Sequence, residues 1–71
     1  MILRKEELEL LKECLEVLEE TDSYDNDVYS DVKLAICTNE WENPIYLLNE
    51  CKFYLDSADL YERLTEYTER F

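Results

Sequence analysis

The stretch KEELELLKECLEVLEE, residues 5–20, decides the fold class of this chain. Its leucines recur at the three- and four-residue spacing that places side chains on one face of an α-helix. Further apolar residues widen this face to half of the cylinder. Together the apolar positions are Leu8, Leu10, Leu11, Cys14, Leu15, Val17 and Leu18. The stretch therefore predicts an amphipathic helix over Lys5 to Glu20, with one side packed against a core.

The following segment, Asp27 to Thr38, fits two patterns. Its apolar residues have helical spacing, but a closely similar set alternates as in a β-strand. A helix is the preferred interpretation, because a lone strand would find no partner elsewhere in the chain and its edge would stay unpaired. Either Asp25 or Asn26 in the preceding polar loop is the expected N-cap.

A third helix is expected to begin at Asn43-Pro44, since Asn caps a helix well and Pro suits the first helical position. This helix is expected to reach about Leu55. Tyr46 and Phe53, seven residues apart, lie opposite its main apolar face. Apolar residues on both sides are typical of the central helix of a bundle.

A fourth helix is expected over Ala58 to Arg70, after a break at Asp56-Ser57 in which Ser57 would be the N-cap. The alternative is one long, bent helix that continues through this weak break. The expected buried stripe of the segment is Leu60, Leu64, Tyr67 and Phe71. With 71 residues and no repeat or linker, the chain is predicted to be a single all-α domain, a compact bundle of three or four short helices.

The composition is strongly acidic. Asp and Glu total 19 against 7 Lys and Arg, which makes the net charge -12, yet the hydrophobic fraction of 46% favours a folded chain. Such a surface would repel phosphate backbones and anionic lipids, so direct binding to nucleic acid or to a membrane is not expected. The sequence has no apolar run near the roughly 20 residues of a membrane span, and no signal-peptide pattern.

The sequence carries no pattern for catalysis or cofactor binding. It has no His and no Gly, which removes the commonest general base and the phosphate-binding loops. The aspartates of residues 22–31 do not form an EF-hand: with Asp25 first, the sixth position is Ser30 and the twelfth is Ile36, where Gly and Glu are required. The chain is therefore expected to be a non-enzyme without cofactor or metal.

The three cysteines are Cys14, Cys37 and Cys51, and they form no Cys-x-x-Cys pair. Without His, these residues could complete a zinc site only by recruiting carboxylates. They are interpreted as small buried hydrophobic residues in a reducing cytosol. The alternative is a disulfide, within the chain or between two chains.

The acidic residues are concentrated near the N-terminal half. Five glutamates of the first helix fall within about 80 degrees of one another, at neighbour distances of about 5–6 Å that resemble the phosphate spacing of a nucleic-acid strand. This row is Glu6, Glu9, Glu13, Glu16 and Glu20. It overlaps a block of eight acids without an intervening basic residue, which is predicted to be uncompensated. The block is Glu13, Glu16, Glu19, Glu20, Asp22, Asp25, Asp27 and Asp31.

A second acidic row lies on the expected fourth helix. It contains Asp59, Glu62, Glu66 and Glu69. Two of these acids have a basic residue four positions later, as Asp59–Arg63 and Glu66–Arg70. This row is interpreted as an ordinary solvated helix face.

Aromatic residues add a second signal, because Tyr and Trp are enriched at protein interfaces. Tyr24, Tyr29 and Trp41 lie in or beside the expected loops and are the candidate contact residues of this type. The full candidate partner-binding set is Glu9, Glu13, Glu16, Glu20, Asp22, Tyr24, Asp25, Asp27, Tyr29, Asp31 and Trp41.

In size, acidity, helical content and lack of catalytic groups, the chain resembles small phage-encoded inhibitors of bacterial defence, including DNA-mimicking anti-CRISPR proteins. The resemblance is carried by the Glu6 to Glu20 row and the Glu13 to Asp31 block. It implies a non-enzymatic inhibitor, a DNA or RNA mimic that occupies a basic nucleic-acid-binding surface. The implied partner is a host or effector protein, such as a CRISPR-Cas component or a nuclease, in the bacterial cytoplasm.

Two other functions remain open. The chain resembles nuclease immunity proteins in placing tyrosines between acids, at Tyr24 and Tyr29, which implies an immunity protein or antitoxin that neutralises a basic nuclease. The third possibility is a plain helical regulatory module that dimerises through Tyr46 and Phe53. The oligomeric state is accordingly monomer or homodimer.

Overall fold

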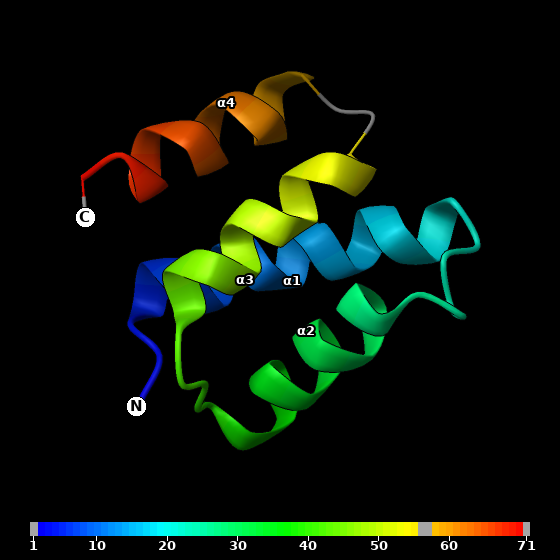
Figure 1. Ribbon diagram of the computed structural model, residues 1–71, viewed down its shortest axis with the longest axis horizontal. Coiled ribbons are helices and arrows are strands. Elements are labelled where there is room, and N and C mark those ends of the chain that lie inside the picture. Colours follow the sequence, from blue (N-terminus) through cyan, green and yellow to red (C-terminus); the bar gives the residue numbers. More distant parts are fainter. Residues whose placement is uncertain (1, 56–57, 71) are drawn as a thin grey trace.

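The computed structural model describes residues 2–55 and 58–70. Within these residues the chain is an all-α bundle, as predicted, and its β-structure is limited to one isolated bridge (Figure 1). The α-helices are α1 (Lys5–Glu20), α2 (Asp27–Thr38), α3 (Pro44–Cys51) and α4 (Ala58–Thr68). A 3₁₀ turn, η1 (Lys52–Tyr54), continues α3.

Helices α1 and α3 form the centre of the bundle. Each of them contacts the other three helices, so that α2 packs on one side of the pair and α4 on the other (Figure 1). The central position predicted for the third helix is therefore confirmed. Its second apolar side is not covered, however, since Tyr46 is 61% and Phe53 84% exposed. The buried residues of α3 are Pro44, Leu47, Leu48 and Cys51, and Tyr46 lies on the exposed side of the same helix.

Helix α1 has the bounds that its apolar stripe predicts. The backbone N–H of Arg4 donates a 2.8 Å hydrogen bond to the Glu7 carboxylate and so ties the first turn together. At the other end Asp22 takes a left-handed conformation with φ 55°, a position that Gly usually fills. The backbone N–H groups of Asp22 and Ser23 then donate to the carbonyls of Glu19 and Leu18, which closes the helix without a glycine.

The segment that fits both helix and strand is helix α2, as preferred. The Asn26 side chain accepts a 2.8 Å hydrogen bond from the backbone N–H of Val28, so Asn26 and not Asp25 is the N-cap. The helix ends at Thr38, and its C-cap is Asn39, whose φ of 57° is again left-handed. The Asn39 carbonyl accepts a 3.0 Å hydrogen bond from the N–H of Leu3, which ties the N-terminal segment to this connector.

Helix α3 begins as predicted, with the Asn43 side chain accepting a 3.1 Å hydrogen bond from the N–H of Tyr46 and with Pro44 in the first turn. Its predicted end at Leu55 is wrong. The α-helix stops at Cys51, the 3₁₀ turn follows, and Leu55 is extended with ψ 131°. This extended residue separates α3 from α4, so the alternative of one long, bent helix is also wrong.

The C-terminal helix is shorter than predicted, since α4 ends at Thr68 and not at Arg70. Three members of its predicted stripe are buried, namely Leu60, Leu64 and Tyr67. The predicted cap at Ser57 and the fourth stripe residue, Phe71, lie outside the described residues.

The core lies between the central pair of helices. Leu11 and Cys14 of α1 belong to the same core cluster as Leu48 and Cys51 of α3, and all four are fully buried. The two thiols are free, and hydrogen bonding with Cys14, followed by burial, raises the pKa of the Cys51 thiol. Both fit the predicted role of small hydrophobic residues. Cys37 does not, because it is exposed on the outer side of α2.

Candidate protein-binding surface

The acids predicted to form an uncompensated block come together at one end of the bundle. They lie on the last turns of α1, on the loop of residues 21–26 and on the first turns of α2 (Figure 1, cyan to green). Glu13, Glu19 and Asp31 are half-buried, and the remaining five acids are exposed. We call these five the acidic corner: Glu16, Glu20, Asp22, Asp25 and Asp27. No ion pair within residues 2–55 and 58–70 involves any of the five.

Tyr24 is the aromatic residue that the acidic corner presents to solvent. Its side chain is 52% exposed, and its ring meets the ring of Tyr29 edge to face, with centroids 5.2 Å apart and an interplanar angle of 75°. The backbone around Tyr24 lies in the polar loop between the capping residues of α1 and α2. Tyr24 is thus a partly exposed aromatic side chain with one edge packed and the other free for contact.

Tyr29 was a contact candidate in the sequence, but it is only 7% exposed and belongs to the core. Its hydroxyl donates a 3.0 Å hydrogen bond to the Glu19 carboxylate, which links α2 to α1. Burial, and then the Glu19 carboxylate, raise the pKa of the Tyr29 hydroxyl. The Lys33 ammonium lies 5.7 Å from the centre of the same ring. Tyr29 therefore packs against the ring of Tyr24 from the core side and exposes little surface to a partner.

Trp41 is not brought to this surface. It lies in the connector between α2 and α3, half-buried against the core. Tyr24 precedes α2 and Trp41 follows it, so the two are separated by the length of a 12-residue helix, about 18 Å. The predicted set of contact residues therefore divides into the acidic corner with Tyr24 and a separate position at Trp41.

The predicted glutamate row of α1 is split by ion pairs with the C-terminal segment, one from α4 and one from the turn after it. Arg63 holds Glu13 with two hydrogen bonds, of 2.8 Å and 2.5 Å, and lies 3.9 Å from Asp59. The hydrogen bond with Arg63 lowers the pKa of the Glu13 carboxyl. The prediction that Glu13 is uncompensated is therefore wrong, because the fold lays α4 alongside α1 and places an arginine opposite this residue.

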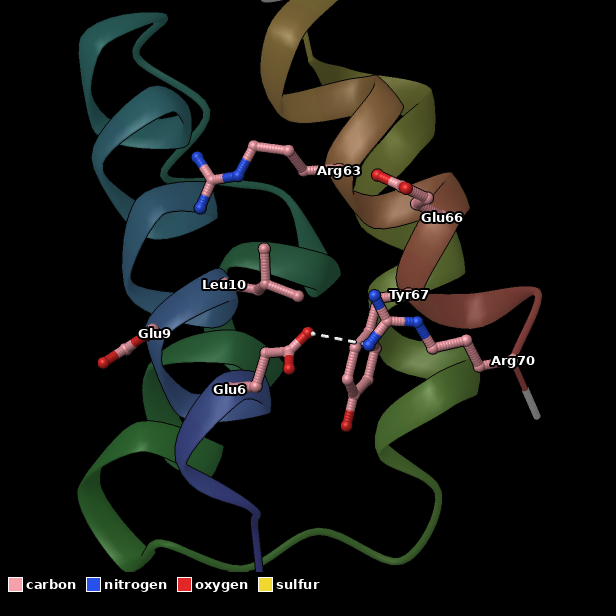
Figure 2. Close-up of a pocket in the computed structure, with 7 residues that line it drawn as sticks. All are labelled: Glu6, Glu9, Leu10, Arg63, Glu66, Tyr67 and Arg70. Carbon is pink, nitrogen blue, oxygen red and sulfur yellow. Dashed lines mark ion pairs between the residues drawn. The ribbon is translucent and has the colours of Figure 1, made fainter.

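A second arginine, Arg70, lies just beyond the end of α4 and pairs with the first turn of α1. Arg70 lies 3.6 Å from the carboxylate of Glu6, as the dashed line in Figure 2 marks. Within the described residues no ion pair joins Arg70 to Glu66, the partner expected from the sequence. On the helical wheel Glu6 and Glu13 form the edge of the row nearest to α4, which explains why these two are paired.

Between α1 and α4 lies an open groove of about 230 Å³. Leu10 and the ring of Tyr67 line it, together with Arg63 of α4 and Arg70 from the turn after α4 (Figure 2). Glu9 of α1 also lines this groove, but within residues 2–55 and 58–70 it makes no ion pair. Glu9 is thus exposed at the groove and outside the ion pairs of the described residues, while its neighbours in the row, Glu6 and Glu13, are paired.

One acid of α1 has a structural role that the sequence reading missed. Glu7 is only 2% exposed, and its carboxylate accepts the hydrogen bond from the N–H of Arg4. Burial, and then hydrogen bonding with Glu7, raise the pKa of the Tyr67 hydroxyl, while Arg4 lowers it. A capping glutamate is expected at the third position of a helix, three residues after the N-cap. The spacing of Glu7 from Arg4 could therefore have indicated this role in the sequence.

Comparison of the chain with protein-family models, with curated proteins and with solved structures finds no match. In the described part of the chain, no three His, Cys, Asp or Glu residues are grouped so that they could hold a metal ion. No helix of residues 2–55 and 58–70 is long and apolar enough to cross a membrane. The acidic corner with Tyr24 is the candidate functional surface, because its five acids are exposed and make no ion pair with any described residue.

Proposed function

We propose that the chain is a non-enzymatic inhibitor that binds the basic, nucleic-acid-binding surface of a partner protein. The acidic corner takes the place of nucleic-acid phosphates, in the manner of the anti-CRISPR class that the chain resembles. The partner is a protein that binds nucleic acid, such as a CRISPR-Cas component or a nuclease. Complementary charge accelerates such an encounter and selects cationic surfaces over others.

The observation that carries the proposal is the contrast in pairing. Arg63 of α4 and Arg70, just beyond its end, pair with Glu13 and Glu6, whereas the five acids of the acidic corner are exposed and make no ion pair with any described residue. Unit charges about 6 Å apart repel by roughly 0.7 kcal/mol even in water, so such a cluster weakly opposes folding. A cationic partner would relieve this repulsion, and Tyr24 would add an apolar contact that becomes buried on binding.

The test uses the purified chain as bait for bacterial proteins that bind DNA. Proteins eluted from a DNA column are passed over the immobilised chain at low and at high salt. We expect a basic protein to be retained at low salt and to be released as the salt concentration rises. We also expect DNA to compete with the chain for binding to this protein. An immunity protein or antitoxin would instead retain a single nuclease whose activity it abolishes.

Two variants with the same net charge make the test specific. The corner variant is Glu16→Lys, Glu20→Lys and Asp25→Lys. The matched control is Glu62→Lys, Glu66→Lys and Glu69→Lys, three exposed acids of α4 and the turn after it, away from the acidic corner. We expect only the corner variant to lose affinity for the partner. Each lost charge pair across the interface, at about 1.4 kcal/mol, should lower the association constant tenfold. Equal loss of affinity in both variants would show that binding depends on net charge and not on the acidic corner. Retention of binding by the corner variant would refute the proposed surface.

A further inference from the structure

Two arginines of the C-terminal segment pair with two glutamates of α1 in matching register. Arg63 holds Glu13 with hydrogen bonds of 2.8 Å and 2.5 Å, and Arg70 lies 3.6 Å from Glu6 (Figure 2). The two glutamates are seven positions apart, as are the two arginines, and the segments run in opposite chain directions. Seven residues span about two helical turns, which keeps both glutamates on one face of α1. We call these two ion pairs the arginine ladder.

The arginine ladder shows which chemical group this face of α1 holds. Two nitrogens of the Arg63 guanidinium donate to the two carboxylate oxygens of Glu13, which is the forked geometry that arginine adopts on carboxylates and phosphates. Glu6 and Glu13 share their face of the helix with Glu16 and Glu20 of the acidic corner. A basic partner that meets the acidic corner with arginines would therefore offer the same group to the same face.

The arginine ladder changes the charge of α1 more than it stabilises the fold. All four side chains are more than 40% exposed, and ion pairs of this exposure contribute little to folding. The attachment of α4 comes instead from its buried leucines, Leu60 and Leu64. Electrostatically the effect is larger, since the row of five glutamates with two paired arginines has a net charge of -3 in place of -5.

We propose that the arginine ladder is an autoinhibitory contact. Arg63 and Arg70 occupy, within the chain, two glutamates that an arginine-bearing partner would otherwise bind, and they confine that partner to the acidic corner. This assignment rests on the proposed function, because the ligand is the arginine of a basic protein surface. A cation held in place on one carboxylate repels an incoming cation, so the ladder acts against binding along the first half of α1.

The test measures binding of a fluorescent octa-arginine peptide by anisotropy at low salt. Arg63→Gln with Arg70→Gln removes the ladder. The matched control, Lys5→Gln with Lys12→Gln, removes the same charge from two exposed lysines of α1 that make no ion pair with any described residue. We expect the arginine variant to bind the peptide about tenfold more tightly than wild type, and the lysine control to gain about threefold or less from net charge alone. Circular dichroism checks that both variants are folded.

A second variant locates the gain. Adding Glu6→Gln and Glu13→Gln to the arginine variant restores the net charge of -12 and should return the affinity for the peptide to that of wild type. The proposal is overturned if the arginine variant shows no gain, if the lysine control gains as much, or if the gain persists without Glu6 and Glu13. Because the probe is a peptide, the ladder can be confirmed even if no nucleic-acid-binding partner is found. Conversely, the acidic corner can bind such a partner even if the ladder proves to mask nothing.

Discussion

Both ends of α1 carry glutamates, but those at the first turn are paired or buried, whereas Glu16 and Glu20 at the last turns are exposed. At the first turn Glu6 is paired with Arg70, and Glu7 is buried as part of the helix cap. At the last turns Glu16 and Glu20 are exposed and lie outside the ion pairs of the described chain. The difference arises from α4, which lies alongside the first half of α1 and does not reach its C-terminal end (Figure 1). An acid-rich helix is therefore not a uniform charged rod, and only its unpaired end is available to a partner.

The largest effect is expected from removing the apolar attachment of α4. Leu64 is fully buried in the core, and its replacement by Ala is expected to lower the free energy of unfolding by about 2–5 kcal/mol. The measurement is urea denaturation followed by circular dichroism. Leu34→Ala, at an exposed position of α2, is the control and should change stability by less than about 0.5 kcal/mol. A loss below about 1 kcal/mol in Leu64→Ala would contradict the packing of α4 on this core.

A smaller effect is expected at the buried acid of the first turn. Glu7→Ala leaves the N–H of Arg4 without its acceptor and removes a buried group beside Tyr67, which should cost about 1–3 kcal/mol. Glu7→Gln keeps an acceptor and should cost less. Glu20→Ala, at the exposed end of the same helix, removes the same charge and should leave the unfolding free energy nearly unchanged. Equal losses of unfolding free energy in Glu7→Ala and Glu20→Ala would contradict the structural role of Glu7.

The smallest effect concerns the pair between Glu13 and Arg63. Both side chains are more than 40% exposed, so the pair should contribute no more than about 1 kcal/mol at neutral pH. Because the pKa of Glu13 is lowered from 4.5 in the folded chain, its contribution is present above that value and is lost as the pH falls through the lower, folded pKa. Wild type should therefore exceed Glu13→Gln in stability near neutral pH, and the difference should shrink below about pH 4.

The control for this pair is Glu16→Gln, which removes one exposed negative charge of the same helix without touching an ion pair of the described residues. Urea denaturation at several pH values measures both variants. A stability difference between wild type and Glu13→Gln that stays constant from neutral pH to about pH 3 would show that the Arg63 contact adds nothing to folding.

Most helix boundaries could be predicted because the signals are local. The bounds of α1 and α2 and the start of α3 depend on apolar spacing and on the capping residues Asn26 and Asn43, all within a few positions of one another. The end of α3 could not be predicted, since no helix-breaking residue follows Cys51. There the chain leaves the helix, Leu55 packs against the core, and Lys52 hydrogen-bonds to Thr68 of α4.

The candidate surface was predicted in part. The acids around the loop of residues 21–26 are exposed as the charge pattern suggested, and Tyr24 lies among them. The aromatic candidates separated because exposure depends on which side of a helix meets the core: Tyr29 turns inward, Trp41 lies at the far end of α2, and Phe53 turns outward. Spacing places Phe53 on the opposite side from the main apolar face, but it does not say whether another helix covers that side.

By itself the sequence determined the all-α class, most helix boundaries and the strongly acidic end of the bundle, because helical periodicity and capping act between near neighbours. Only the tertiary structure decided which acids are neutralised. Glu13 and Arg63 are 50 positions apart, and they meet only because Leu60 and Leu64 bury one side of α4 and so lay that helix beside α1. Charge pairing across helices is a consequence of core packing, and it cannot be read from a count of acids and bases.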